Sequence, residues 1–495
     1  MVSIQGFISK IKSMIRELQN GRAVKILFVV LLVISCGVLI TMEQYIAVGV
    51  LLIMLLSALI VFKVNSTDFF IVIFTVGIPF SYSYTLITAR KPAVGPAWPR
   101  MIRDAFLLLL VANITWQGIR RNTISFWRKK RILPLALWLI YTLGLAILSL
   151  DLSLITLWVG VKYYLLFPML GLLIPAILDD RAILRYLLNL FFGVAIFIAI
   201  FGILQTLLGD PFVFQYDTGR ILGMRVARAT SVWGTPLSLA GYLGMILSLW
   251  HPLRKQLDAK FQGWKGHIFT LILWLCLFLT LTRSALVAVL ASFAFSGILL
   301  SRKRSNIIWG LVILLSLIPL INLVAWIRMP SLLGGYGILP YDARISGWMS
   351  LLKTFSQSPL QQILLGRGLG SSSGMVQFEN MEVLNSALVH SGAFTTDNFY
   401  LTALFEIGVV GLLIFCIVAF TYIRLAVKFH RDSENPFLKS VYTGILFGLN
   451  FFLIRNIFLQ GARTTLAGFY FWALIGLMLA TKNISEFPVE AHAKS

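Results

Sequence analysis

Residues 271–300 read LILWLCLFLTLTRSALVAVLASFAFSGILL, and Arg283 is the single charged side chain among them. A helix that crosses a bilayer needs roughly 20 apolar residues. With the few residues before it, this stretch is long enough for two such helices. We therefore predict a tight helical hairpin within a membrane, with Arg283 at its bend.

The rest of the chain has the same character. Of its 495 residues 58% are hydrophobic and 12% charged, and the mean hydropathy is +0.88. Soluble domains carry about a quarter charged residues, so the composition excludes an ordinary soluble enzyme. We predict an all-α polytopic membrane protein with about fourteen spans. The predicted spans are 26–42, 45–62, 69–84, 104–117, 133–150, 154–178, 186–208, 231–250, 267–282, 284–300, 307–326, 399–423, 440–459 and 464–481.

Basic residues in short loops set the orientation, because such loops stay in the cytoplasm. With fourteen spans, every strongly basic loop falls on one side, and both termini are predicted to be cytoplasmic. The opposite, outer side holds the longest extramembrane segment. The predicted regions are a basic N-terminus (1–25), eleven spans (26–326), a long outer loop with short helices (327–398), three spans (399–481) and a cytoplasmic tail (482–495).

The net charge of +23 predicts anionic partners. In a membrane protein these are membrane lipids and lipid phosphates rather than nucleic acid. Cys36, Cys276 and Cys416 all lie in apolar runs, which argues against a disulfide framework or a metal cluster. We expect no metal and no cofactor.

The predicted outer side is rich in arginine and poor in lysine. A guanidinium matches two phosphate oxygens at once, whereas an ammonium is a point charge. The pattern therefore favours a site for a lipid-linked phosphate or pyrophosphate; the alternative is that these arginines reach to lipid headgroups. The outer arginines are Arg90, Arg100, Arg103, Arg220, Arg225, Arg228, Arg283, Arg328, Arg344, Arg367, Arg455 and Arg463.

Arg283 is the strongest candidate, because an arginine within the membrane costs roughly 2.5–3.5 kcal/mol on insertion scales. The alternative is a structural ion pair with an acid such as Glu406. Lys162 and Arg455 also lie within or near predicted spans and are weaker candidates.

The long outer loop carries three further patterns. Residues 341–352 predict an amphipathic helix, with Asp342 as its N-cap and Arg344 in its first turn. Its apolar face would lie on the membrane or on the helix bundle and consists of Ile345, Trp348, Met349 and Leu352. Residues 366–370 read GRGLG; with no strand before them and no helix after them, they predict a flexible turn rather than a nucleotide-binding loop. Asp397 precedes span twelve and is either a helix cap or a general base.

His390 is the competing base, because its pKa lies nearer neutrality. Asn398 and Tyr400 follow Asp397 and are candidate contacts for the substrate, together with Arg220 and Arg225.

Together, four motifs resemble the O-antigen ligase and O-antigen polymerase family of bacterial membrane glycosyltransferases. They are RATSVWGTP at 228–236, TRS at 282–284, DAR at 342–344 with the later LGRGLG, and DN at 397–398 followed by GVVG at 408–411. The order of these motifs carries the resemblance, and the last is the most specific. Asp397 stands where ligases have histidine, which favours a polymerase or a related exopolysaccharide enzyme.

The resemblance implies a GT-C-like fold with a helical periplasmic cap, in the bacterial inner membrane. It also implies a metal-independent glycosyltransferase acting on undecaprenyl-pyrophosphate-linked glycans at the periplasmic face. The acceptor would be another glycan or, for a ligase, lipid A-core, and other polysaccharide assembly proteins would be partners. On this basis Arg283 and Arg344 contact the pyrophosphate, with Arg228 as a further contact. A polysaccharide-lipid flippase is the rival, but the ionisable residues gather on the outer side and form no path across.

Overall fold

The computed structural model describes two compact units, Met1–Arg121 and Asn122–Ser495. The described residues are 66–80, 130–149, 151–152, 154–208, 218–221, 224–233, 235–257, 261–301, 351–371, 398–458 and 465–486, with 108, 110, 111, 113, 115, 308, 310–312 and 348–349.

The first unit is described over one continuous helical segment and over five helical residues (108, 110, 111, 113 and 115) within the span predicted at 104–117. Helix α4 (Ser66–Val72) continues through a π-helical turn (Ile73–Gly77) into α5 (Ile78–Phe80). The Thr75 hydroxyl donates to the Ile71 carbonyl at 2.6 Å, so its polar group is satisfied within the segment. The segment overlaps the span predicted at 69–84. The spans predicted at 26–42 and 45–62 lie outside the described residues.

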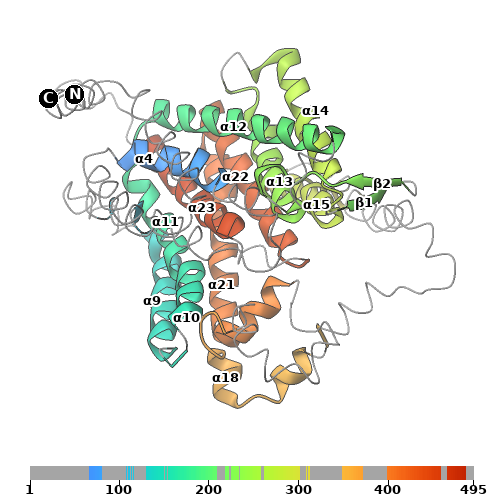
Figure 1. The fold of residues 1–495 in the computed structure, drawn as a ribbon. Coiled ribbons are helices and arrows are strands. Elements are labelled where there is room, and N and C mark those ends of the chain that lie inside the picture. The colour runs from blue at the N-terminus through green and yellow to red at the C-terminus, as the bar shows by residue number, and fades with distance from the viewer. Residues whose placement is uncertain are drawn as a thin grey trace, which may run out of the picture. The chain divides into compact units, whose positions relative to one another are not determined.

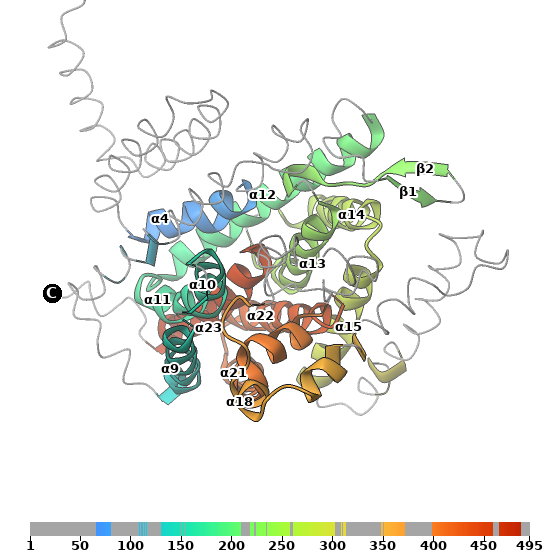
Figure 2. The ribbon, with the colours of Figure 1, turned by 60° about the horizontal axis from the view of Figure 1, so that its bottom comes forward.

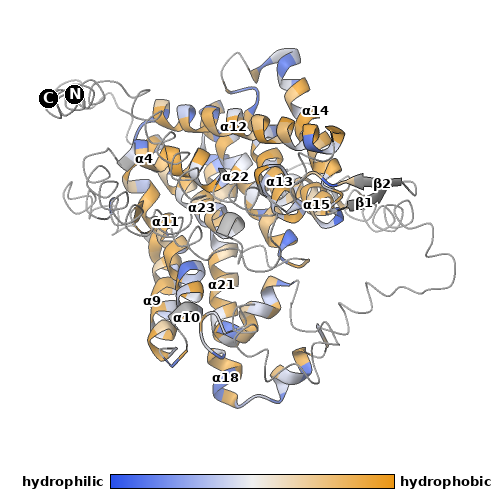
Figure 3. Ribbon diagram, viewed as in Figure 1, coloured by the Kyte–Doolittle hydropathy of each residue, from blue (hydrophilic) through white to orange (hydrophobic). Residues whose placement is uncertain are grey.

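The second unit is helical, and apolar residues cover its helices on most sides (Figures 1 and 3). Such a pattern is typical of helices in a membrane or a large core. The helices are α9 (Leu133–Leu148), α10 (Leu154–Val161), α11 (Phe167–Leu173), α12 (Arg181–Leu208), α13 (Pro236–Leu253), α14 (Gly263–Leu279), α15 (Arg283–Leu300), α18 (Leu360–Leu365), α21 (Phe399–Asp432), α22 (Pro436–Arg455) and α23 (Thr465–Glu486).

These helices confirm a helical membrane protein. Within the described part, five helical segments are long and apolar enough to cross a membrane: Thr156–Ala176, α12, α15, α21 and α22. Every span predicted from residue 133 onward coincides with a helix, except 307–326, which lies mostly outside the described residues. The all-α prediction missed one element, an antiparallel hairpin of β1 (Thr218–Ile221) and β2 (Met224–Ala227).

Helix α22 lies in the middle of the second unit and packs against α13, α15, α21 and α23 (Figure 2). A small residue allows the closest approach: a Cβ on Gly244 of α13 would overlap the Phe451 ring and press on Val289 of α15. Close contact at small residues is how helices associate within lipid, where burial of apolar surface gives little driving force. This packing fixes the relative positions of the helix ends that form the candidate site.

Helix α21 is two helices joined by a kink at Gly408. Gly408 has φ +66° and ψ −176°, a backbone conformation essentially confined to glycine. The kink frees the carbonyls of Phe405, Glu406 and Ile407 from the normal helical pattern. Each has another donor: the Arg367 amide at 2.7 Å, the Gly368 amide at 3.2 Å and the Tyr141 hydroxyl at 2.7 Å, respectively. These three carbonyls are therefore satisfied by residues outside α21, and the kink is built into the fold.

Candidate functional site

Arg283 is the first residue of α15, directly after the turn that closes the predicted hairpin. The turn contains Leu281 in a left-handed conformation, with φ +52°, which ends α14 and redirects the chain. Thr282 is the N-cap residue of α15, but its side chain makes no capping hydrogen bond. The turn and the position of Arg283 at it are confirmed, but the tight hairpin is not: α14 packs on α12 and α13, and α15 packs on α13 and α22, rather than on each other.

The Arg283 side chain is half-buried and makes no hydrogen bond or ion pair with any residue that the structure describes. The proposed structural pair with Glu406 is wrong: that carboxylate is fully buried and accepts a hydrogen bond from the Tyr164 hydroxyl at 2.8 Å. A cation at a helix N-terminus is repelled by the positive end of the helix dipole. The N-terminus of α15 therefore has the features of an anion site: an unpaired guanidinium and no capping side chain.

Arg228 lies against the same turn. Its Nε donates to the Thr280 carbonyl at 2.9 Å and one terminal nitrogen donates to the Thr282 hydroxyl at 3.4 Å. The next amide, of Ala229, donates to the Leu279 carbonyl at 3.0 Å. These contacts fix segment 228–230 beside the N-terminus of α15, so they place a second guanidinium near Arg283.

A buried polar network holds Ser231, which comes directly after segment 228–230. The Ser231 amide donates to the Gln205 side-chain oxygen at 2.6 Å, and the Ser231 hydroxyl donates to the Ile198 carbonyl at 2.7 Å. Ser231 has φ +48°, an uncommon conformation for a residue with a side chain. The network ties the arginine segment to α12 and leads it into α13.

Arg455 ends α22 and is 3% exposed. One terminal nitrogen donates to the Leu237 carbonyl in the first turn of α13 at 2.6 Å, and its Nε has no hydrogen-bond partner. The guanidinium lies so close to Gly241 that a Cβ there would overlap it. Arg455 thus fastens α22 to α13 at the end where segment 228–235 enters α13.

Asn398 is the N-cap of α21. Its side-chain oxygen accepts from the amides of Tyr400 at 2.9 Å and Leu401 at 3.1 Å. The prediction that Asp397 caps this helix is therefore wrong, because the cap is the following residue. The Tyr400 hydroxyl donates to the Leu453 carbonyl of α22 at 2.7 Å, so Tyr400 ties the two helix ends together.

The structure thus brings Arg228, Arg283, Arg455, Asn398 and Tyr400 to the same end of the second unit, at the starts of α13, α15 and α21 and the end of α22. Arg220 and Arg225 precede them on the hairpin, where their Cα atoms are register partners; their side chains lie outside the described part. Asp397, His390 and Arg344 also lie outside the described residues.

Part of the predicted helix at 341–352 is described and continues to residue 356. Two residues of its predicted apolar face are exposed: Met349 is 63% and Leu352 40% exposed. The contact with the bundle is made instead by Phe355, whose ring lies 5.4 Å from that of Phe405 on α21. The predicted apolar face is therefore not the face that packs on α21.

The glycine-rich segment 366–370 is not a flexible turn, as its sequence predicted, but packs closely between α21 and α10. Gly366, Gly368 and Gly370 all have positive φ, between +81° and +105°. A Cβ on Gly366 would overlap the Glu406 backbone, and one on Gly370 would overlap the Thr156 carbonyl. The turn packs against the kink at Gly408. The feature of the sequence that could have indicated this contact is the presence of two glycine motifs, GRGLG at 366–370 and GVVG at 408–411.

Sequence reasoning missed Glu406 as a structural centre. It lies beside the kink, and its partner Tyr164 belongs to a π-helical turn, Lys162–Leu166, an element often found at functional sites. Lys162, a weaker candidate from the sequence, is 5% exposed in this turn, and its ammonium lies 5.0 Å from the centre of the Tyr163 ring. The described residues contain no group of three or more His, Cys, Asp and Glu side chains arranged to hold a metal.

Comparison with known proteins identifies this region. Residues 268–416 match a family model described as O-antigen ligase. The match begins in α14, includes Arg283 and the glycine-rich turn, and ends in α21 beyond Gly408. A search of curated proteins gives no match. The predicted resemblance is confirmed for this part of the chain: residues 268–416 are similar to the family described as O-antigen ligase.

Proposed function

We propose that this protein is a metal-independent membrane glycosyltransferase of the polymerase type, which extends or transfers a glycan from undecaprenyl pyrophosphate. One observation carries the proposal: the guanidinium of Arg283 is unpaired at the N-terminus of α15, beside Arg228 on the same turn. Two guanidiniums and a helix N-terminus form a concentrated positive site, and a pyrophosphate supplies the matching negative charge.

The reaction is a displacement at the anomeric carbon of the donor. An acceptor hydroxyl attacks this carbon, and the bond from the carbon to the pyrophosphate oxygen breaks with inversion. The hydroxyl proton passes to Asp397 or His390, and the bonding electrons leave with the lipid pyrophosphate. Because negative charge grows on the leaving group, cations held in place beforehand lower the barrier.

The residues take different parts in this scheme. Arg283 contacts the pyrophosphate, with Arg344 from the outer loop as its partner. Arg228 uses two of its nitrogens on the turn and so positions the N-terminus of α15 as well as adding positive charge. Arg220 and Arg225 on the β1–β2 hairpin and Arg455 at the end of α22 are further candidate contacts for the substrate. The side-chain oxygen of Asn398 and the hydroxyl of Tyr400 hold the start of α21. The base, Asp397 or His390, lies in the loop just before this helix.

The proposed architecture has about fourteen spans, both termini in the cytoplasm and the site facing the periplasm. The arrangement of the described helices supports it, because Arg228 before α13, Arg283 at the start of α15 and Arg455 at the end of α22 lie at one end of the bundle, together with the start of α21. At the opposite end of the bundle, Arg431 donates to the Leu299 carbonyl at 3.1 Å. The loops that follow α13 and α15 there are basic, as expected of the cytoplasmic side.

The name of the matched family favours a second candidate, transfer of the finished glycan to lipid A-core by an O-antigen ligase. One experiment separates the two. Purified full-length protein receives a lipid-linked oligosaccharide, with and without lipid A-core, and the products are identified by mass. A polymerase produces a ladder of lipid-linked repeats without lipid A-core. A ligase produces only glycosylated lipid A-core. Absence of any transfer product refutes the enzymatic proposal.

A further inference from the structure

A second polar region lies at the other end of the second unit. A cavity of about 980 Å³ opens where α12 and α22 begin and where α21 and α23 end. The arginine site lies at the starts of α21 and the end of α22, so the cavity is separated from it by the length of these helices. On the proposed topology the cavity faces the cytoplasmic leaflet.

One face of α12 lines this cavity with polar side chains. Arg181, Arg185 and Asn189 follow at intervals of four residues and all line it. Successive members of such a series lie about 6 Å apart along the helix axis. The series therefore leads from the exposed helix start toward the apolar interior, where Asn189 is 7% exposed.

These side chains lack partners that their burial demands. The Nε of Arg185 and the side-chain oxygen of Asn189 are both buried without a hydrogen bond. Leaving a buried polar group without a hydrogen bond destabilises the folded protein, so a ligand that supplies the missing partner is favoured. Rotation of the Asn189 amide group by 180° exchanges its oxygen and its nitrogen. Asn189 can therefore accept a hydrogen bond from a ligand or donate one to it. Together with the Tyr442 hydroxyl, three of the buried unsatisfied atoms found in the described part belong to residues that line the same cavity.

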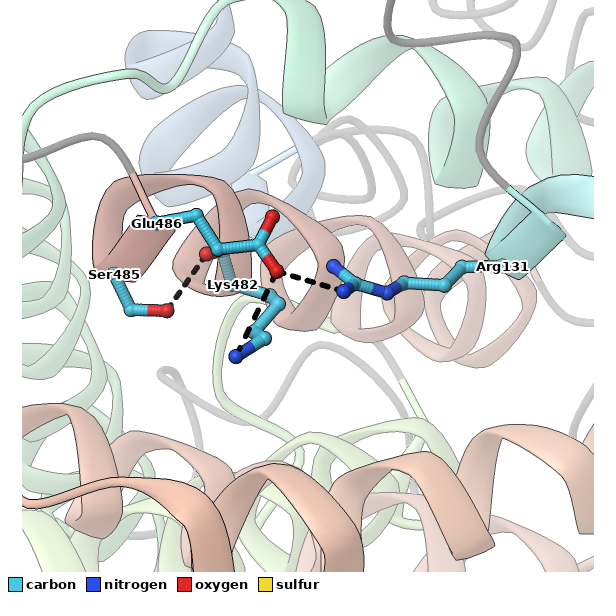
Figure 4. Close-up of polar contacts among 4 residues, drawn as sticks. All are labelled: Arg131, Lys482, Ser485 and Glu486. Atoms are coloured by element: carbon cyan, nitrogen blue, oxygen red, sulfur yellow. Dashed lines mark hydrogen bonds and ion pairs between the residues drawn. The ribbon is translucent and has the colours of Figure 1, made fainter.

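Arg181 and Arg185 also have no carboxylate partner among the described residues. Both guanidiniums lie over the ring of Phe437, at 5.5 Å and 5.0 Å from its centre. Like charges four residues apart on a helix repel each other. An anion bound between the two arginines would attract both and so offset that repulsion. Lys482, on another wall, differs: Figure 4 shows its ammonium near Glu486, at 3.7 Å.

The same Glu486 carboxylate accepts from Arg131 at 2.7 Å, so this acid is already neutralised (Figure 4). Asp432 and Glu434, in contrast, line the cavity and make no ion pair with a described residue. The cavity therefore holds two arginines on α12 without an ion pair, and two such acids, Asp432 at the end of α21 and Glu434 in the segment before α22. A third lining acid, Asp180, accepts from the Ala182 amide at 2.8 Å. A ligand that carries both charges would satisfy both sets.

We propose that this cavity binds the headgroup of a zwitterionic phospholipid with a primary ammonium. Its phosphate lies between Arg181 and Arg185, its ammonium meets Asp432 and Glu434, and its glycerol ester lies deeper, at the amide of Asn189. The order of these groups with depth is that of a phospholipid. Tyr186, 47% exposed beside Arg185, marks the headgroup level at which tyrosines gather.

The test measures the thermal unfolding of the full-length protein in detergent, with each of five additives. They are phosphatidylethanolamine, phosphatidylcholine, phosphatidylglycerol, soluble phosphoethanolamine and inorganic phosphate. Phosphatidylethanolamine is expected to raise the unfolding temperature most, because phosphatidylcholine has no N–H donor and phosphatidylglycerol no cation. An equal effect of phosphatidylglycerol, or of inorganic phosphate, overturns the zwitterionic lipid assignment.

Variants locate the effect. Arg181→Gln/Arg185→Gln should weaken apparent lipid binding about tenfold or more, because charge-assisted hydrogen bonds to phosphate are lost. Arg424→Gln is the matched control: Arg424 is exposed and lies over the Phe420 ring, outside the cavity.

Asp432→Asn/Glu434→Gln should remove the preference for phosphatidylethanolamine over phosphatidylcholine while the phosphate contact remains. This second pair keeps the test decisive should the arginine variant not fold. An unchanged preference in the acid variant, or an unchanged response in a folded arginine variant, overturns the proposal.

Discussion

Substitution of Gly408 by alanine tests whether the kink in α21 and the glycine-rich turn form one structural unit. Gly408 has φ +66° and ψ −176°, where a residue with a Cβ costs about 1–3 kcal/mol. The new Cβ would also overlap the Leu364 carbonyl and the Gly366 amide, so the turn must move away. That movement breaks the hydrogen bonds from the Arg367 and Gly368 amides, worth about 0.5–1.5 kcal/mol each.

Together these terms predict that Gly408→Ala lowers the free energy of unfolding by about 2–6 kcal/mol. The measurement is unfolding of the purified protein in mixed micelles of increasing denaturing detergent. Gly193→Ala is the matched control, because Gly193 lies in α12 with nothing within 4 Å of an added Cβ. It should unfold like the wild type or slightly later, since alanine favours the helix. Equal stability of the two variants would refute the reasoning.

Three further predictions concern the cap, the base and the topology. Asn398→Ala should lose about 0.5–2 kcal/mol of stability in the same unfolding assay while Asn398→Asp holds, because aspartate caps a helix as well as asparagine does. Asp397→Asn should remain folded with transfer slowed by about 10²–10⁴-fold if Asp397 is the base; a normal rate together with an inactive His390→Ala assigns the base to His390 instead. A cysteine placed at Ser372 should react with an impermeant label added outside the cell, whereas one at Ser305 should not; labelling at both positions contradicts the proposed topology.

The sequence predicted the helices because the period and length of an apolar run are local properties. The division between α14 and α15 is the clearest case, since one charged residue divides the apolar run and the turn forms there. The packing of the two helices on each other was predicted wrongly, because their partners α12, α13 and α22 lie far away in the sequence. The β1–β2 hairpin was missed because its residues lie between two long apolar runs and lack the alternation typical of a half-buried strand.

Long-range contacts were harder to predict. Glu406 is paired with Tyr164, 242 residues earlier, and no local pattern gives that partner. The glycine-rich turn was interpreted as flexible because a motif alone does not show what packs on it. Its three positive φ angles serve a fit between α21, which Gly366 contacts, and residues 149–160, which Gly368 and Gly370 contact. Asn398 rather than Asp397 caps α21, since either residue type suits a cap and only the backbone angles decide which one does.

The central claim, that the Arg283 guanidinium binds the pyrophosphate of the donor, is tested most directly by the rate of glycan transfer by Arg283→Lys. Lysine keeps the charge but cannot form two parallel hydrogen bonds to phosphate. The Arg283 side chain has no partner among the described residues, so the variant should fold normally. We predict transfer slowed by about 10²-fold or more, the scale of losing one such donor, with Arg424→Lys at the wild-type rate. A folded Arg283→Lys protein that transfers glycan at the wild-type rate would contradict the claim.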